Sequence, residues 1–180
     1  MKLFTLGNNF FVPLFFIGMK KLLIIRHAKS SWQDFTVPDL DRPLNDRGKR
    51  DAPIMAERIA SRKIHPDFIL TSPAKRARKT AELFLRTLDV PEENITEMPT
   101  LYEAGVGAFY DAVAGSPVSA TTIMLFSHNP GITAFVNELT DVKIDDMPTC
   151  AVYAISCNIA EWSEFRSAPK EFLFFDYPKA

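Results

Sequence analysis

Short, continuous runs of apolar residues alternate along this chain with longer segments in which apolar residues recur at helical spacing. The first run, Leu22-Leu23-Ile24-Ile25, has no polar interruption, and similar runs lie within residues 67–71 and 121–126. Unbroken runs of this kind are typical of strands that are buried on both faces of a parallel sheet. We therefore expect these three segments to be core strands.

Helical segments should follow these strands. Asn45 is a candidate N-cap for a helix that extends to about Ser61, although Pro53 should kink this helix or move its start later. Ser72-Pro73 and Asn129-Pro130 each combine a capping residue with proline at the first helical position, so helices should also begin there. The remaining expected elements are a strand at 95–98, a helix at 104–114, and strands at 151–156, 161–166 and 171–175. Strands that alternate with helices predict an α/β fold, a three-layer α/β/α sandwich around a mostly parallel central sheet.

The composition is that of an ordinary globular domain. Of the 180 residues, 47% are hydrophobic and 24% are charged, which is enough for a single sizeable core. The net charge of −1 offers no basic surface for a nucleic acid. Cys150 and Cys157 lack metal-ligand spacing and indicate reduced thiols in a cytoplasmic protein.

The N-terminal segment differs from the rest of the chain. Residues 1–18 are rich in phenylalanine, and Met19-Lys20-Lys21 then resembles a second natural start. The apolar part of this segment is too short to span a membrane, and no cleavage site of small residues follows it. We therefore expect residues 1–18 to be an extension outside the core and residues 19–180 to form one domain.

The three expected core strands end in polar residues that suit the binding of an oxyanion. Arg26-His27 follows the first strand, Ser72 follows the second with Arg76 close behind, and Ser127-His128 follows the third. The carboxyl ends of parallel strands lie at one edge of a sheet, where ligands bind in open α/β folds. Two histidines, two arginines and helix N-termini at this edge would form a receptor for a tetrahedral oxyanion such as phosphate.

These segments resemble the histidine phosphatase superfamily, whose members have the phosphoglycerate mutase-like fold. Within it, they are most similar to the small SixA-type phosphohistidine phosphatases, from about Met19 to the end of the chain. Ala28 replaces the superfamily glycine, and Asn129 replaces the aspartate with which the phytase-like branch donates a proton, which argues against that branch. The matching motifs are Arg26-His27-Ala28-Lys29-Ser30, Arg42-Pro43-Leu44, Ser72-Pro73-Ala74-Lys75-Arg76-Ala77 with Thr80, and Ser127-His128-Asn129-Pro130.

The resemblance implies a catalytic role for each of four residues. Neutral His27 would be the nucleophile that attacks phosphorus and forms a phosphohistidine intermediate. Arg26 and Arg76 would bind the phosphoryl oxygens, and His128, cationic when phosphate is bound, would complete the clamp. No carboxylate cluster suggests a metal ion, and this chemistry needs no cofactor.

Four further residues are second-tier candidates. Glu103 occupies the place where related mutases carry a glutamate acid, so it would donate a proton to the leaving group. The alternative is that Glu103 begins the helix at 104–114, where its charge favours the helix dipole. Ser30, Gln33 and Arg42, on the loop after the first strand, would contact phosphate, and simple packing within the loop is the alternative for Ser30 and Gln33.

Three functions are compatible with these residues. The first is hydrolysis of phosphohistidine on a protein, for which the open pocket of a short chain is suited. The second is hydrolysis of small phosphomonoesters, which predicts a deeper pocket and a well-placed Glu103. The third is a non-catalytic module that binds phosphorylated partners, and it would not require His27. We therefore expect a phosphatase that acts on a phosphoprotein or a small phosphoester and that engages neither nucleic acid nor membrane.

Overall fold

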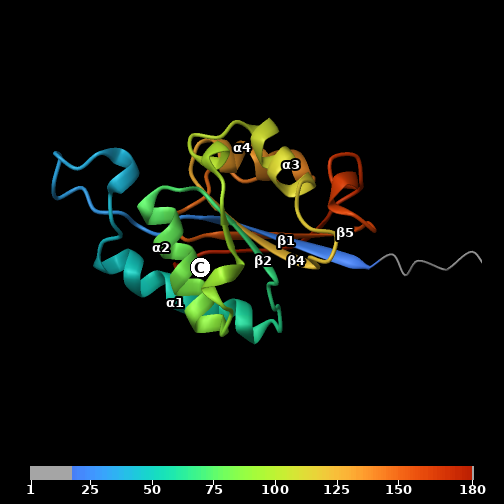
Figure 1. Cartoon of the computed structure of the whole chain (residues 1–180), viewed down its shortest axis with the longest axis horizontal. Helices are drawn as coiled ribbons and strands as arrows, with labels where there is room; N and C mark the ends of the chain where they lie inside the picture. Colours follow the sequence, from blue (N-terminus) through green and yellow to red (C-terminus); the bar gives the residue numbers. More distant parts are fainter. Residues whose placement is uncertain (1–17, 180) are drawn as a thin grey trace, which may run out of the picture.

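A six-stranded mixed sheet forms the centre of the computed structural model, which describes residues 18–179 (Figure 1). The strand order is β3-β2-β4-β1-β5-β6, and the pairings of β3 with β2, β2 with β4 and β4 with β1 are parallel. β5 and β6 extend the sheet in antiparallel fashion. The strands are β1 (Met19–Arg26), β2 (Phe68–Thr71), β3 (Ile95–Glu97), β4 (Thr122–Ser127), β5 (Val152–Asn158) and β6 (Glu171–Asp176).

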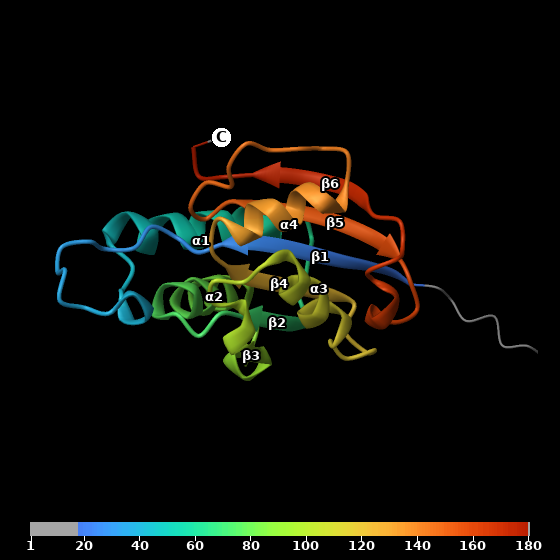
Figure 2. The same ribbon diagram turned by 90° about the horizontal axis from the view of Figure 1, so that it is seen from above.

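Helices cover both faces of this sheet, so the expected three-layer α/β/α sandwich is confirmed. Figures 1 and 2 show α1 and α2 on one face and α3 and α4 on the other. Successive residues of β1 alternate between the two cores: Leu22 packs with the α3 and α4 side, and Leu23 packs with the α1 and α2 side. The four helices are α1 (Asp46–Ser61), α2 (Lys75–Leu88), α3 (Val106–Ala114) and α4 (Gly131–Leu139).

The start of α1 is fixed by its cap, and Pro53 does not move it. The Asn45 side chain accepts a hydrogen bond from the Gly48 backbone N–H at 2.9 Å, as expected for an N-cap. The helix then continues through Pro53 to Ser61, so the expectation of a later start is wrong. Gly48 lies against the backbone of Lys29, which a β-carbon at this position would overlap, and this packing holds the first turn of α1 under the end of β1.

The expected starts of α2 and α4, at Pro73 and Pro130, lie one or two residues too early, and the supposed capping side chains do not cap these helices. α2 begins at Lys75 and α4 at Gly131, and neither has a side-chain cap. The Ser72 hydroxyl lies 2.8 Å from His128 Nε2, and Asn129 donates to Asp146. The Ser72 hydroxyl also accepts from the Ala74 N–H at 3.2 Å, and Asn129 Oδ1 accepts from the Thr133 hydroxyl of α4 at 2.8 Å. Both side chains therefore tie the loops at the sheet edge to the start of the following helix.

The segment 161–166 is a turn and not the expected strand. Residues Trp162–Glu164 form a short 3₁₀ helix with a capping box between Glu161 and Glu164. Trp162 is fully buried, and its indole N–H donates to the Ala120 carbonyl at 2.8 Å. Two buried aromatic side chains, Trp162 and Phe165, account for the apolar character of this segment, and not a strand alternation.

The structure bears on only part of the expected N-terminal extension, residues 1–18. β1 begins at Met19, and residues 1–17 of the expected extension lie outside the described residues. Within residues 18–179, no helix has the length and apolar character needed to cross a membrane. Cys150 and Cys157 are both buried and free.

Candidate active site

The ends of β1, β4 and β2 bring the predicted side chains to one edge of the sheet. These strands are adjacent, and Arg26 at the end of β1 is paired in register with Ser127 at the end of β4. The imidazole rings of His27 and His128 therefore lie side by side, with centroids 4.9 Å apart. Arg76, in the first turn of α2, also belongs to this edge, because its charge acts on both histidines. The sequence prediction of a shared edge is confirmed for these residues.

His27 is held in the form that a nucleophile requires. It is 7% exposed, and its Nδ1 lies 2.7 Å from the Ala28 carbonyl oxygen. A carbonyl only accepts hydrogen bonds, so we assign the proton to Nδ1, which leaves the lone pair on Nε2. Burial lowers the pKa of His27 to about 4; the Ala28 carbonyl opposes this shift, and the charges of Arg76 and Arg26 reinforce it. His27 is therefore neutral at pH 7.

His128 is neutral as well in this structure. Burial lowers its pKa to about 3, with further lowering from His27 and Arg76. Its Nε2 is hydrogen-bonded to Ser72, whereas its buried Nδ1 has no partner among the described residues. The cationic His128 that was expected in the phosphate-bound state therefore needs the charge of a bound anion, and it stays a prediction.

Both arginines of the predicted clamp, Arg26 and Arg76, already donate hydrogen bonds to carboxylate and carbonyl oxygens of nearby loops. Arg76 is 5% exposed; its Nη2 donates to Asp39 Oδ2 at 2.8 Å and its Nη1 donates to the Asp39 carbonyl. Arg26 Nη1 donates to the Met147 carbonyl at 2.6 Å and to Asp146 Oδ2 at 3.3 Å. The Nε atoms of both arginines remain without hydrogen-bond partners within residues 18–179.

These unpaired nitrogens are concentrated in the predicted site. Six buried side-chain nitrogen or oxygen atoms lack a hydrogen-bond partner in the described part of the chain, and five of them belong to Arg26, Arg42, Arg76 and His128. One of the five, Arg42 Nε, lies 3.3 Å from Asp39 Oδ1 in an ion pair, and the other four have no partner within residues 18–179. A buried donor without a partner costs about 1–3 kcal/mol. Their concentration at one sheet edge indicates a site that an oxyanion would complete.

Of the candidates on the loop after β1, Ser30 and Arg42 interact with each other at the site, and Gln33 does not lie with them. Arg42 is 7% exposed, its Nη2 donates to Ser30 Oγ at 3.1 Å, and its guanidinium stacks 3.5 Å from the Trp32 ring centroid. The charge of Arg42 is among those that lower the pKa of His27. Gln33 is exposed and lines a separate depression with Ser31, away from the cavity described next.

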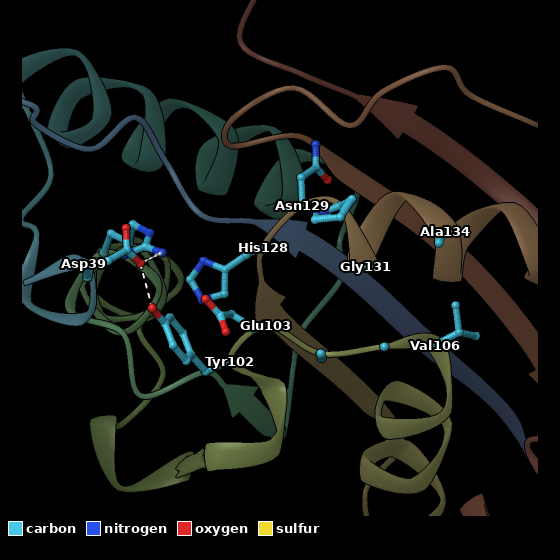
Figure 3. A pocket seen from close by; sticks show the side chains of 12 residues that line it. Asp39, Tyr102, Glu103, Val106, His128, Asn129, Gly131 and Ala134 are labelled. Carbon is cyan, nitrogen blue, oxygen red and sulfur yellow. Dashed lines mark hydrogen bonds and ion pairs between the residues drawn. The ribbon is translucent and has the colours of Figure 1, made fainter.

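Glu103 lines a cavity of about 640 Å³ together with Arg76 and His128 (Figure 3). The cavity continues past the two basic side chains to small and apolar residues that include Val106 and Ala134. Glu103 is exposed and has a left-handed backbone (φ 50°), and the N-cap of α3 is Gly105. The alternative in which Glu103 begins α3 is therefore wrong.

Three loop residues at this site were not predicted. Asp39 and Tyr102 line the cavity and hydrogen-bond to each other at 2.8 Å, and Asp146 pairs with Arg26. The sequence offers little that separates Asp39 from Asp41, because both precede Arg42 in the same polar loop. Within residues 18–179, no group of three histidine, cysteine or carboxylate side chains is arranged to hold a metal ion.

Comparison with known proteins identifies the class of protein to which this site belongs. The family model described as the histidine phosphatase superfamily (branch 1) matches residues 22–114, slightly more than half of the chain. The protein belongs to this superfamily. The match includes Arg26, His27, Arg76 and Glu103, whereas His128 lies beyond it.

Individual relatives agree with this assignment. An uncharacterized chloroplastic protein of Arabidopsis thaliana is 29% identical over 153 residues, which cover 81% of this chain and 70% of that protein. A protein assigned as the phosphohistidine phosphatase SixA of Agrobacterium tumefaciens has a similar structure, with a TM-score of 0.75, 24% identity and coverage of 88% of this chain and 98% of that one. The protein histidine phosphatase SixA complexed with tungstate gives a TM-score of 0.76 at 21% identity and covers 88% of this chain and 97% of that one. At these identities the structures establish the shared phosphoglycerate mutase-like fold.

Proposed function

We propose that this protein is a phosphatase that removes a phosphoryl group from phosphohistidine on a protein by way of a phosphorylated His27. The observation that carries the proposal is the neutral, lone-pair-bearing Nε2 of His27 beside buried donors that lack partners. A bound oxyanion would satisfy those donors and place its central atom near the nucleophile. The likeness to SixA proteins, one of which is complexed with tungstate, supports an oxyanion at this edge.

The proposed reaction has two steps that regenerate the protein. First, His27 Nε2 attacks phosphorus in line, a new N–P bond forms, and the bond from phosphorus to the leaving imidazole breaks. The leaving imidazole departs with a proton on its other nitrogen. Water then attacks the phosphorylated His27, inorganic phosphate leaves, and neutral His27 returns. Arg26, Arg76 and His128 would hold the charge that spreads over the phosphoryl oxygens in both transition states.

A second candidate function is hydrolysis of a small phosphomonoester in the same pocket. The cavity of about 640 Å³ favours this alternative, because it extends past Arg76 and His128 and has Glu103 in its wall. Space beyond the phosphate would accommodate a small organic group, and Glu103 would protonate an alkoxide leaving group. An imidazole leaves more easily than an alkoxide once it is protonated, so Glu103 matters less for phosphohistidine.

The test compares turnover of a phosphohistidine-bearing protein with turnover of a panel of alcohol and sugar phosphates. We expect higher kcat/KM for phosphohistidine and an acid-labile phosphoryl group on His27 during turnover. Replacement His27→Ala should reduce kcat by at least about 1,000-fold, since removal of a nucleophile abolishes the covalent route. His65→Ala is the matched control, because His65 is exposed and does not line the cavity, and it should retain full activity.

Each failure has a distinct meaning. A preference for alcohol or sugar phosphates by orders of magnitude would favour the phosphomonoester phosphatase. Unchanged turnover in the His27→Ala variant would remove His27 from the mechanism. Phosphate binding without turnover of any substrate would favour the non-catalytic binding module.

A further inference from the structure

Asp39 occupies the two Nη atoms of Arg76, which in the predicted clamp would bind the phosphoryl oxygens. Both Nη atoms of Arg76 donate to Asp39, one to the carboxylate and one to the backbone carbonyl. Tyr102 donates its hydroxyl hydrogen to the same carboxylate oxygen, Oδ2, at 2.8 Å, and Arg42 Nε lies 3.3 Å from Oδ1. Figure 3 shows Asp39 and Tyr102 joined in this way beside His128, and all three residues line the cavity.

The two partners of this ion pair differ in how firmly they are held. The side chain of Arg76 is 6% exposed and is fixed in the first turn of α2. The side chain of Asp39 is 49% exposed and comes from a short 3₁₀ turn, Asp39–Asp41, in the loop between β1 and α1. The carboxylate is therefore the partner that can move away, and the arginine is the partner that stays.

A carboxylate and a phosphoryl group compete for the same donors. Both present two oxygens that match the planar fork of a guanidinium. A phosphoryl group that accepts hydrogen bonds from the Nη atoms of Arg76 must displace Asp39. A phosphoryl group that binds only to Nε is repelled by the negative charge of the neighbouring Asp39 carboxylate. Partial burial acts to raise the pKa of Asp39, but the hydrogen bonds from Tyr102 and Arg76 and the charges of Arg76 and Arg42 together outweigh it, so this pKa lies below its ordinary value. Asp39 therefore keeps its charge at pH 7.

Asp146, which pairs with the other arginine of the site, provides a contrast. It pairs with Arg26 at 3.3 Å, but it does not line the cavity, and Arg26 also donates to the Met147 carbonyl. Asp146 therefore holds Arg26 from a position that does not line the cavity, whereas Asp39 lines the cavity beside Arg76.

We propose that Asp39 is a built-in competitor for the anion site, which pairs with Arg76 when the site is empty and weakens the binding of inorganic phosphate. Its function in turnover, which rests on the proposed phosphatase activity, would be to promote release of the phosphate product. Competition with Asp39 weakens the binding of substrate and product by the same factor. The substrate keeps the contacts that its leaving group makes with the rest of the cavity, whereas the phosphate product has no such contacts and is released. The competition for binding itself does not depend on catalysis.

The experiment measures binding of inorganic phosphate to the full chain by titration calorimetry at pH 7. Asp39→Asn keeps the shape of the side chain and removes its charge, and it should lower the Kd for phosphate by about tenfold, because like charges in contact repel strongly. Asp41→Asn is the matched control: Asp41 is exposed in the same turn and makes no side-chain hydrogen bond or ion pair within residues 18–179. It should change the Kd by less than about twofold.

Tyr102→Phe provides a second and independent variant. It removes the hydroxyl that holds Asp39 but keeps the ring, whose centroid lies 5.7 Å from that of His128. The Kd for phosphate should also fall, by about threefold. The effect is smaller because Asp39 loses only one of its hydrogen bonds and keeps its charge and its pairing with Arg76.

An unchanged or higher Kd in Asp39→Asn would overturn the proposal and would make Asp39 a support for Arg76. If Asp39→Asn does not fold, an unchanged or higher Kd in Tyr102→Phe has the same meaning. Because binding is measured without turnover, a catalytically silent protein in which Asp39→Asn still tightens phosphate binding would refute the phosphatase but not the competitor. In an active enzyme, the inhibition constant for phosphate should fall by the same factor as the Kd.

Discussion

His27 and His128 follow buried strands, whereas Asp39, Glu103 and Asp146 come from connecting loops. The two histidines are 7% and 8% exposed, but the side chains of Asp39 and Asp146 are 49% and 66% exposed. The proposed nucleophile His27 and its neighbour His128 thus lie on the buried part of the site, and the acidic groups lie on its more exposed part.

This difference assigns different tasks to the two regions. Groups at strand ends have fixed positions, as the reacting atoms require. Carboxylates on loops can leave a buried arginine when an anion arrives and return when it departs, so the arginine is not left without a partner. The strand ends should therefore determine whether the reaction occurs, and the loops should adjust which ligands bind and how quickly they leave.

The largest effect should come from a change in Arg76, which is buried in the first turn of α2 beside the strand ends. Arg76→Lys keeps the positive charge but removes the planar fork, and it should lower kcat/KM by about 100-fold or more. Arg78→Lys is the control on the same helix, because Arg78 is exposed and pairs with Glu82 at the surface. Steady-state kinetics on the preferred substrate would measure both. If Arg76→Lys is as active as the wild type, the site does not depend on a fixed bidentate donor.

The strand ends could be predicted from the sequence because their signals are local. Unbroken apolar runs define buried strands, and parallel pairing brings the residues after them to one edge, so Arg26, His27 and His128 were placed correctly without coordinates. The cap and approximate end of α1 were equally clear, since the Asn45 cap depends only on residues within one turn.

The loops could not be predicted because their partners are distant in sequence. Ser72 has the pattern of an N-cap, but His128, 56 residues later, engages its hydroxyl. Asp39 meets Arg76 across 37 residues and Tyr102 across 63, and no pattern within the loop distinguishes it from Asp41. The turn at Trp162 was mistaken for a strand for the same reason, since its partner Ala120 lies in another part of the chain.

An intermediate effect should appear in the pH dependence of stability. An unfolded histidine has a pKa of about 6.5, whereas burial lowers the pKa values of His27 and His128 to about 4 and about 3. Between pH 7 and 5.5 the unfolded chain therefore takes up protons that the folded protein does not, so the free energy of unfolding falls as the pH falls. Each histidine should contribute about 1 kcal/mol to this decrease.

Urea unfolding of the wild type and of the His27→Ala and His128→Ala variants at pH 7 and 5.5 would measure this contribution. Each variant should show a smaller decrease than the wild type. An unchanged decrease in both variants would mean that burial at the strand ends does not lower the pKa values of His27 and His128. The two regions would then not differ in the way that they treat charged groups.

With phosphohistidine as the substrate, the smallest effect should come from the loop residue Glu103. Glu103→Gln keeps the volume of the side chain and removes its capacity as an acid. For phosphohistidine, whose leaving imidazole needs little assistance, kcat should fall by less than about threefold; for an alcohol phosphate, loss of a general acid should cost about 100-fold or more. Glu57→Gln, on the exposed face of α1, is the control. A loss of about 100-fold on phosphohistidine would show that an exposed loop carboxylate is as necessary as the buried histidines, and the division between strand ends and loops would then not hold.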